Sequence, residues 1–231
     1  MTNLGFLAPE RPAGGSAATR VFEDLRRRII ALELPPGTPF LRAELAQRYD
    51  VSQTPIREAM QRLEQEGLVK VYPQSKTVVT KIDVPQIYEA HFLRTAVEIE
   101  LVRRLAEEPP KETLARARSL LRMQDAVKGD PAQMAVFQEL DEVFHQTLFD
   151  GIGQGGIHAL IRARSGHLNR LRRLDPPSGE KIAYILRGHG EILDGIEARD
   201  PAAAMVAMRD HLSRTVARVE EQRAAHPDFF S

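Results

Sequence analysis

The chain has 231 residues, of which 42% are hydrophobic and 28% charged, an ordinary composition for a globular protein that buries a core. It contains no cysteine, which excludes disulfides and thiolate metal ligands and leaves His, Asp and Glu to hold a metal. The 32 basic and 32 acidic residues balance, so a surface that binds nucleic acid would have to concentrate its positive charge locally.

Residues 1–18 are rich in glycine, alanine and proline and contain neither a basic start nor a continuous apolar core. They therefore predict a disordered leader and not a signal peptide. No stretch of the chain reaches the roughly 18 to 20 consecutive apolar residues that a membrane-spanning helix needs. We expect a cytoplasmic protein with no membrane partner.

Residues 19–83 predict a winged helix-turn-helix DNA-binding domain. Apolar residues recur at helical spacing in three segments, and a short loop joins the last two. After Gly67 the apolar period changes to that of strands, which predicts a β-hairpin wing. A small helical cap on a larger domain is the alternative, but it does not explain this change of period. The predicted helices cover residues 19–32, 42–49 and 52–66, and the two wing strands lie on either side of residues 73–76.

Residues 84–225 predict an all-α antiparallel helical bundle, followed by a short tail at residues 226–231. Six helices are expected, because proline or glycine interrupts the helical pattern at five places. The expected fold class is therefore mainly α: a winged helix-turn-helix of three helices and a hairpin, then the bundle. The five interruptions lie at residues 109–110, 129–131, 151–156, 176–179 and 200–201.

Four side chains able to bind a metal fall on apolar helix faces of the predicted bundle. Asp141 and His145 are four residues apart and so share one face of a helix, and an ionised Asp on a core-facing stripe is costly unless it is paired or bound to a metal. His189 and His211 lie on or beside the apolar stripes of two later helices. Three imidazoles and one carboxylate suit zinc, nickel, iron or manganese. The alternative for each histidine taken alone is a core residue with satisfied hydrogen bonds.

Arg94 is the second polar anomaly of the bundle. It falls in line with the apolar residues of the first bundle helix. Because Arg is the planar, bidentate partner of carboxylates, it indicates a site for an acidic ligand. An ion pair with Glu98, four residues further on, is the alternative.

Two segments of the chain resemble a known family. The first looks like the DNA-binding signature of GntR-family regulators, which is long and specific. The remainder resembles the FCD effector domain of the FadR subfamily, and six bundle helices are closer to its VanR-like group. The resemblance covers residues 19–221. It is carried by LAQRYDVSQTPIREA (residues 45–59), LEQEGLV (residues 63–69), Arg94 with Glu98, Asp141 with Phe144 and His145, and then His189 and His211.

The resemblance implies a homodimer that binds a short pseudo-palindromic DNA operator, each recognition helix reading one half-site. In this family arginine often stands at the position of Gln53 and glycine at that of Lys76. Because glutamine suits adenine better than guanine, the operator is expected to differ. Arg57 is expected to reach guanine or a phosphate, with an ion pair to Glu44 as the alternative. The implied DNA-binding residues are Arg42, Glu44, Ser52, Gln53, Thr54 and Arg57 on the paired helices, and Gln74, Ser75 and Lys76 at the wing tip.

For the bundle, the resemblance implies a divalent metal, zinc first, and a small organic acid that completes its coordination. Relatives often carry asparagine at the position of Gln154 and glutamate at that of Gly188, so the surroundings of the pocket are expected to differ. The implied metal ligands are Asp141, His145, His189 and His211, and the implied ligand-binding residues are Arg94 and Gln154.

These features together predict a metabolite-responsive transcriptional regulator, most simply a repressor, and not an enzyme. One alternative is a regulator whose metal is purely structural and whose signal is a protein or a molecule other than an acid. The other is a metal-dependent hydrolase, since open positions on a His/Asp site permit water activation. The hydrolase is disfavoured, because the sequence has no HExxH motif and no separate general base near the four ligands.

Overall fold

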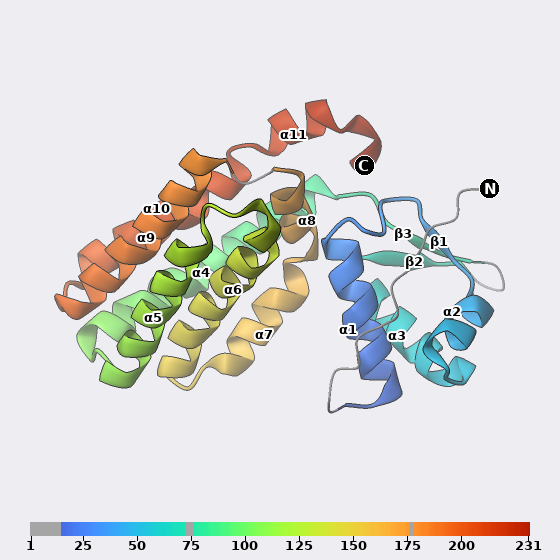
Figure 1. Cartoon of the computed structure of the whole chain (residues 1–231), viewed down its shortest axis with the longest axis horizontal. Helices are drawn as coiled ribbons and strands as arrows, with labels where there is room; N and C mark the ends of the chain where they lie inside the picture. Colours follow the sequence, from blue (N-terminus) through green and yellow to red (C-terminus); the bar gives the residue numbers. More distant parts are fainter. Residues whose placement is uncertain (1–14, 73–75, 176–177) are drawn as a thin grey trace.

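The computed structural model describes residues 15–72, 76–175 and 178–231. They form two parts, shown in Figure 1: a small head of three helices and a sheet, and a larger helical domain beside it. The predicted leader lies outside the described residues up to residue 14, and the first helix begins at Ala17, two residues before the expected boundary. None of the described helices is long and apolar enough to cross a membrane.

The head has the helix, helix, helix and wing order that the sequence predicts. Its core is formed by apolar residues of α1 and α3, among which Leu25, Ile56 and Leu63 are fully buried. Two of the three strands are the predicted wing, and the third, β1, has only two residues, too few to show an alternating pattern. The elements are α1 (Ala17–Ile30), β1 (Pro39–Phe40), α2 (Arg42–Tyr49), α3 (Gln53–Gln65), β2 (Val69–Val71) and β3 (Thr77–Val79), with antiparallel strand order β1-β3-β2.

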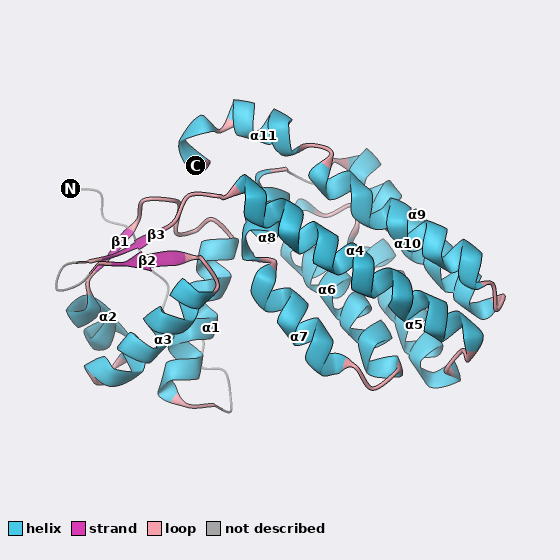
Figure 2. Ribbon diagram, turned by 180° about the vertical axis from the view of Figure 1, so that it is seen from behind, coloured by secondary structure: helices cyan, strands magenta, loops and turns pink. Residues whose placement is uncertain are grey.

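The helical domain is built around its longest helix, α4, which packs against α6, α7, α8, α9 and α10. Figure 2 shows α4 crossing the front of this domain. A continuous apolar core joins the helices, with Val102, Phe144 and Ile192 fully buried in it. The helices are α4 (Val84–Glu107), α5 (Lys111–Val127), α6 (Met134–Gly151), α7 (Gly155–Arg164), α8 (Gly166–Leu174), α9 (Gly179–Glu197), α10 (Pro201–Val216) and α11 (Val219–Ala225).

The prediction of six helices in this domain was wrong, because its described residues contain eight α-helices. The extra breaks fall at Ser165, between α7 and α8, and at residues 217–218, before α11. At the first of them the chain packs closely against the head, where a Cβ on Gly166 would lie 2.8 Å from Leu68 Cδ2. No proline or glycine pair marks either break in the sequence. With eight helices, the number of helices does not support the predicted resemblance to the six-helix, VanR-like group.

Helix α8 joins the two parts of the molecule. The imidazole Nδ1 of His167 accepts the Asp83 backbone N–H at 3.1 Å, and burial lowers the pKa of His167 to about 4, so the ring is neutral. The Arg170 side chain is fully buried and donates from Nη2 to the Thr80 carbonyl oxygen at 2.6 Å. Burial lowers the pKa of Arg170 to about 10, which leaves it charged at neutral pH. Two buried polar groups of α8 therefore bind the backbone that leads out of the head.

Two further contacts hold the same junction. Arg26 of α1 donates to Glu66 Oε2 and to the backbone oxygen of Arg162, both at 2.6 Å. The predicted tail is packed against the linker: Phe230 is buried and pairs with Ile82 in a parallel bridge. The head is therefore attached to the helical domain by hydrogen bonds from several elements.

Helices α9 and α10 approach closely at Gly195, which gives a test of the packing. A Cβ there would lie 2.7 Å from the Ala204 backbone nitrogen, whereas a Cβ on Gly190 of the same helix would meet nothing within 4 Å. Gly→Ala gains about 1 kcal/mol of helix propensity, but overpacking costs about 1–3 kcal/mol. We expect Gly195→Ala to lower the free energy of unfolding in urea and Gly190→Ala to leave it equal or higher. Equal effects would contradict this packing.

Candidate metal centre and nucleic-acid interface

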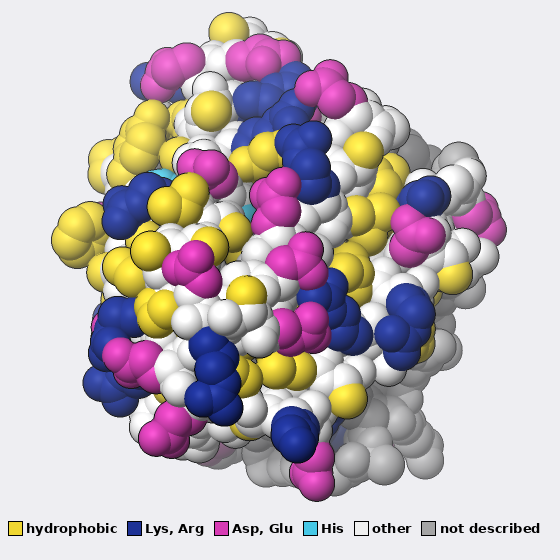
Figure 3. All heavy atoms as spheres, turned by 90° about the vertical axis from the view of Figure 1, so that its left-hand side faces the viewer, with side chains coloured by type: hydrophobic (Ala, Val, Ile, Leu, Met, Phe, Trp, Pro, Cys, Tyr) yellow, Lys and Arg dark blue, Asp and Glu magenta, His cyan; other side chains and the backbone are white. Residues whose placement is uncertain are grey.

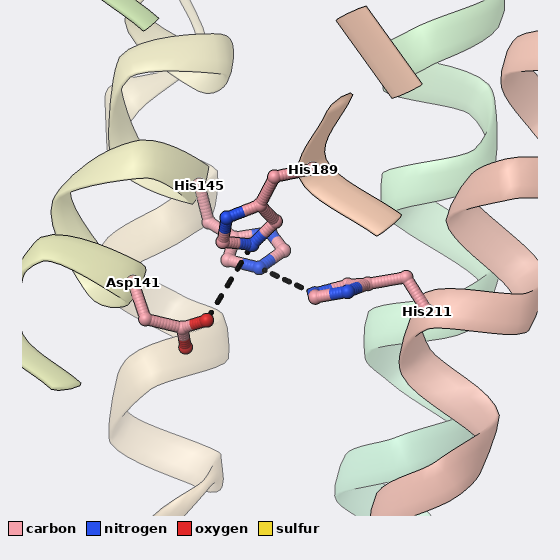
Figure 4. A group of neighbouring side chains, drawn as sticks. All are labelled: Asp141, His145, His189 and His211. Carbon is pink, nitrogen blue, oxygen red and sulfur yellow. Dashed lines mark hydrogen bonds and ion pairs between the residues drawn. The ribbon is translucent and has the colours of Figure 1, made fainter. Parts of the chain in front are cut away.

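The four predicted metal ligands lie together in the interior of the helical domain. Asp141 and His145 come from α6, His189 from α9 and His211 from α10, and all four are buried. One ligand atom from each lies within 4.8 Å of the others. Figure 4 shows the three imidazoles and the carboxylate pointing toward one another. The spacing of an i, i+4 pair and two apolar helix stripes thus predicted a real cluster.

Neighbouring side chains orient two of the histidines. His145 Nδ1 lies 2.6 Å from Glu98 Oε2, and His189 Nδ1 lies 2.9 Å from Gln124 Oε1. Each Nδ1 can therefore carry the proton, which leaves the Nε2 lone pair for a metal, the usual arrangement behind a metal-bound histidine. His145 Nε2 lies 3.2 Å from His211 Nε2, so these two ring nitrogens already face each other. Phe144 stacks on the His189 ring with centroids 3.9 Å apart. Neighbouring side chains of the protein thus hold both rings in position.

Asp141 is divided between an arginine and the histidines. Its Oδ2 accepts Arg172 Nη2 at 2.5 Å, and its Oδ1 lies 3.4 Å from His189 Nε2. Burial alone would raise the pKa of Asp141, but Arg172 and the histidines outweigh it and hold the pKa below its usual range. Burial and His145 lower the pKa of His211 to about 3. Burial also lowers the pKa of His189, so the cluster combines an ionised carboxylate with neutral imidazoles at His189 and His211.

The donor set fits a divalent cation. Asp141 Oδ1, His189 Nε2 and His211 Nδ1 are buried without a hydrogen-bond partner, and unsatisfied buried polar atoms are costly unless something binds them. Three imidazoles and one carboxylate are ligands that zinc and similar metals accept. These residues could hold such a metal with further positions open to a ligand.

Arg94 both pairs with Glu98 and lines the cavity beside the cluster. Its Nε donates to Glu98 Oε1 at 2.7 Å, so the ion pair is confirmed. Burial would raise the pKa of Glu98, but Arg94 and His145 lower it further than burial raises it, so Glu98 stays ionised. Arg94 also lines the cavity beside the cluster. The ion pair therefore leaves the side chain at the wall of a ligand-sized space.

That cavity has a volume of about 100 Å³. It reaches three members of the cluster and extends between the start of α9, the end of α10 and α8. Gln154 does not line it: the residue is exposed beyond the end of α6 and precedes α7, so the structure does not bring it to the other site residues. The wall is formed in part by Arg94, Asp141, His145, Arg172, Lys181, Tyr184, His211 and Arg218.

Sequence reasoning missed three residues that contact the cluster. Glu98 was considered only as a partner of Arg94, although it also binds His145. Gln124 has a weak signal, since it is a polar residue on the buried face of α5. Arg172 gave none, because its role depends on α8 being a separate helix that brings it to Asp141.

The predicted DNA-binding side chains are arranged on the surface of the head. Ser52 is the N-cap of α3 but makes no side-chain cap hydrogen bond, which leaves its hydroxyl available. Arg57 has no ion pair with Glu44 within the part of the chain that the structure describes, so that alternative is not realised. Gln74 and Ser75 lie outside the described residues. Gln53, Thr54, Arg57, Glu44 and Lys76 are exposed, and Arg42 is half-buried.

Comparison with known families assigns both parts of the chain. The model of the gntR family of bacterial regulatory proteins matches residues 17–79, and that of the FCD domain matches residues 86–214. The chain is a GntR-family transcriptional regulator of the FadR-like subfamily. The mainly α fold with its winged head, predicted from the sequence, is thereby confirmed.

Similar proteins agree with this assignment. An HTH-type transcriptional regulator of Streptomyces ambofaciens is 35% identical over 91% of this chain and 88% of its own. The HTH-type transcriptional repressor RspR of Escherichia coli is 29% identical over 92% of each chain. The structure of E. coli McbR/YncC is similar in fold, with a TM-score of 0.75 over 90% of this chain and 99% of its own at 18% identity. This regulator therefore belongs among DNA-binding proteins, not enzymes.

Glu98 provides a test of the metal centre. Glu98→Gln removes the carboxylate that orients His145, and loss of such an outer partner typically lowers metal affinity 10–100-fold. We expect a fall of that size in zinc affinity, measured by competition with a chromophoric chelator. Glu100→Gln, on the exposed face of the same helix, should change affinity little. Unchanged affinity in Glu98→Gln, in protein that is shown to be folded, would contradict the role of Glu98.

Proposed function

We propose that this regulator is a repressor that binds a pseudo-palindromic operator as a homodimer and responds to a small organic acid bound beside a divalent metal. The observation that carries the proposal is the cavity that opens onto Asp141, His145 and His211 and is also lined by Arg94. The similarity to a protein named a repressor supports the direction of the response. Because the partner is chromosomal DNA, the proposed place of action is the cytoplasm.

The proposed metal is zinc, with nickel, iron or manganese as substitutes that accept the same donors. Asp141, His145, His189 and His211 would hold it. When bound, it would supply a Lewis-acid centre with open positions for a carboxylate. Arg94 would pair with the acid. Glu98 and Gln124 hold the imidazoles of His145 and His189 in orientation.

The proposed DNA contacts follow from the exposed start of α3. This helix would enter the major groove, with Gln53 placed to read adenine and Arg57 to reach guanine or a phosphate. Ser52 and Thr54 would bind the phosphate backbone and set the register. Arg42 and Glu44 on α2 and Lys76 on the wing would complete the interface, with Gln74 and Ser75 proposed there from the sequence alone.

A second copy of the chain is the proposed partner of the exposed α4 face. Tyr88 and Phe92 lie one helical turn apart on α4 and are 47% and 76% exposed. Neighbouring exposed aromatic side chains are typical of protein interfaces. Figure 2 shows α4 on the outside of the helical domain. Pairing across this face would give the two-fold symmetry that a palindromic operator requires.

Helix α8 offers a direct route from the cavity to the head. Arg172 binds Asp141 at the cavity, while His167 and Arg170, on the same helix, bind the backbone of Asp83 and Thr80. A ligand that moves Asp141 would therefore act on a helix that also holds the head. The effect on the operator requires that the ligand bind the two arrangements with different affinity.

Operator binding tests the DNA-reading part. The purified dimer should prefer a palindrome near its own gene, with affinity that falls steeply as salt rises. Arg57→Ala should weaken this binding by about tenfold or more, since a good base contact contributes about 1–3 kcal/mol. Arg187→Ala, an exposed arginine of the helical domain, serves as the control. No salt-sensitive preference for any such palindrome would contradict the proposal.

Arg172 tests the coupling. A panel of small organic acids is first screened for release of the operator by zinc-loaded protein. We expect Arg172→Gln to reduce operator release by the active acid more than it reduces binding of the acid in calorimetry. Arg173→Gln, the adjacent arginine outside the cavity lining, should behave as wild type. Loss of acid binding and of release in equal proportion would show that Arg172 acts only as a ligand contact.

A further inference from the structure

The cavity wall carries more basic than acidic side chains. Its five basic residues are opposed by only three acids, Asp141, Asp175 and Glu180, of which Asp141 belongs to the metal cluster. The outer face of the domain in Figure 3 shows basic and acidic side chains interspersed. Selection of a charged ligand therefore depends on the cavity and not on a field of one sign over that face. The basic residues are Arg94, Arg172, Lys181, Arg214 and Arg218.

Two of these cations share one carboxylate. Lys181 Nζ forms an ion pair with Asp175 Oδ2 at 2.9 Å and donates to the Asp175 backbone oxygen at 2.7 Å. Arg218 Nη1 binds the other oxygen, Oδ1, of the same carboxylate. The Asp175 side chain is 12% exposed and that of Lys181 20% exposed. An ammonium group has three hydrogens to donate, so Lys181 is held in position with one donor still available.

Lys181 is separated along α9 from the histidine that this helix contributes to the metal cluster. Lys181 and His189 are eight residues apart on α9, about 12 Å along the helix axis. Tyr184 and Ile185, which lie between them in the sequence, also line the cavity. A small molecule bound at the cluster would therefore extend along α9 toward Lys181.

We propose that the effector is a small dicarboxylic acid whose second carboxylate binds Lys181, with Arg218 beside it. The inference rests on the proposed function, since the first carboxylate is the one beside the metal and Arg94. A monocarboxylic acid would place an apolar end against a partly desolvated ammonium group, which is unfavourable. A second carboxylate would instead accept its remaining hydrogen in a charge-assisted bond. Lys181 thus acts as a specificity-determining residue.

Calorimetry on the zinc-loaded, full-length regulator tests the proposal with chain-matched acids. Malonate, succinate, glutarate and adipate are compared with propionate, butyrate, valerate and caproate. We expect at least one diacid to bind about tenfold or more tightly than its monoacid, the ratio that one charge-assisted hydrogen bond supplies. Lys181→Met should remove this preference by weakening the diacid alone. Lys128→Met, whose lysine pairs with Asp125 away from the cavity, should retain it.

The results of this experiment distinguish a failure of the second carboxylate site from a failure of the proposed acid effector. If monoacids bind as tightly as diacids, or if Lys181→Met keeps the preference, the second carboxylate site is wrong while an acid effector stands. If no acid of either series binds, the proposed acid effector is contradicted together with this inference. Should Lys181→Met fail to fold, Lys181→Arg keeps the charge and decides the matter: it must still prefer the diacid.

Discussion

The burial of the Asp141 carboxylate imposes the central constraint on this molecule. An ionised carboxylate in a protein interior is strongly unfavourable unless other groups compensate it. Here Arg172 binds one oxygen, and the other faces the imidazoles. Because Asp141 lies on α6, Arg172 on α8, and the histidines on α6, α9 and α10, compensation of one charge fixes the relative positions of four helices. The apolar core of the domain packs around this polar centre.

The same constraint organises the outer contacts. Glu98 is fully buried in α4 and stays ionised because Arg94 and His145 both bind it. Gln124 brings α5 into the network through His189. Each helix of the domain that contacts the centre thus contributes a polar partner, and such networks are stable only when every member is satisfied. Among the buried atoms without a hydrogen-bond partner in the described residues are one each from the candidate ligands Asp141, His189 and His211.

The sequence predicted what depends on local pattern. Helix positions in the head followed from apolar spacing, and the four candidate ligands followed from their places on apolar stripes. It did not predict the break at Ser165, because no proline or glycine pair marks it, and Gly166 lies there against Leu68, far away in the chain. For the same reason the sequence did not show the role of Arg172. It also predicted Gln154 as a ligand-binding residue, whereas the fold places Gln154 before α7, away from the cavity lining. Side chains that act through tertiary contacts leave no periodic signal.

The linker between the two parts of the molecule is fixed at three successive points. Arg170 binds Thr80, Phe230 pairs with Ile82, and His167 binds Asp83. A connection held in this way is a stiff joint and not a flexible tether. Reorientation of the head has to break these contacts together, so we expect a few discrete positions of the head and not a continuous range of angles. In the proposed dimer, the spacing between the two heads would then take only a few values, each of which matches or mismatches the helical repeat of DNA.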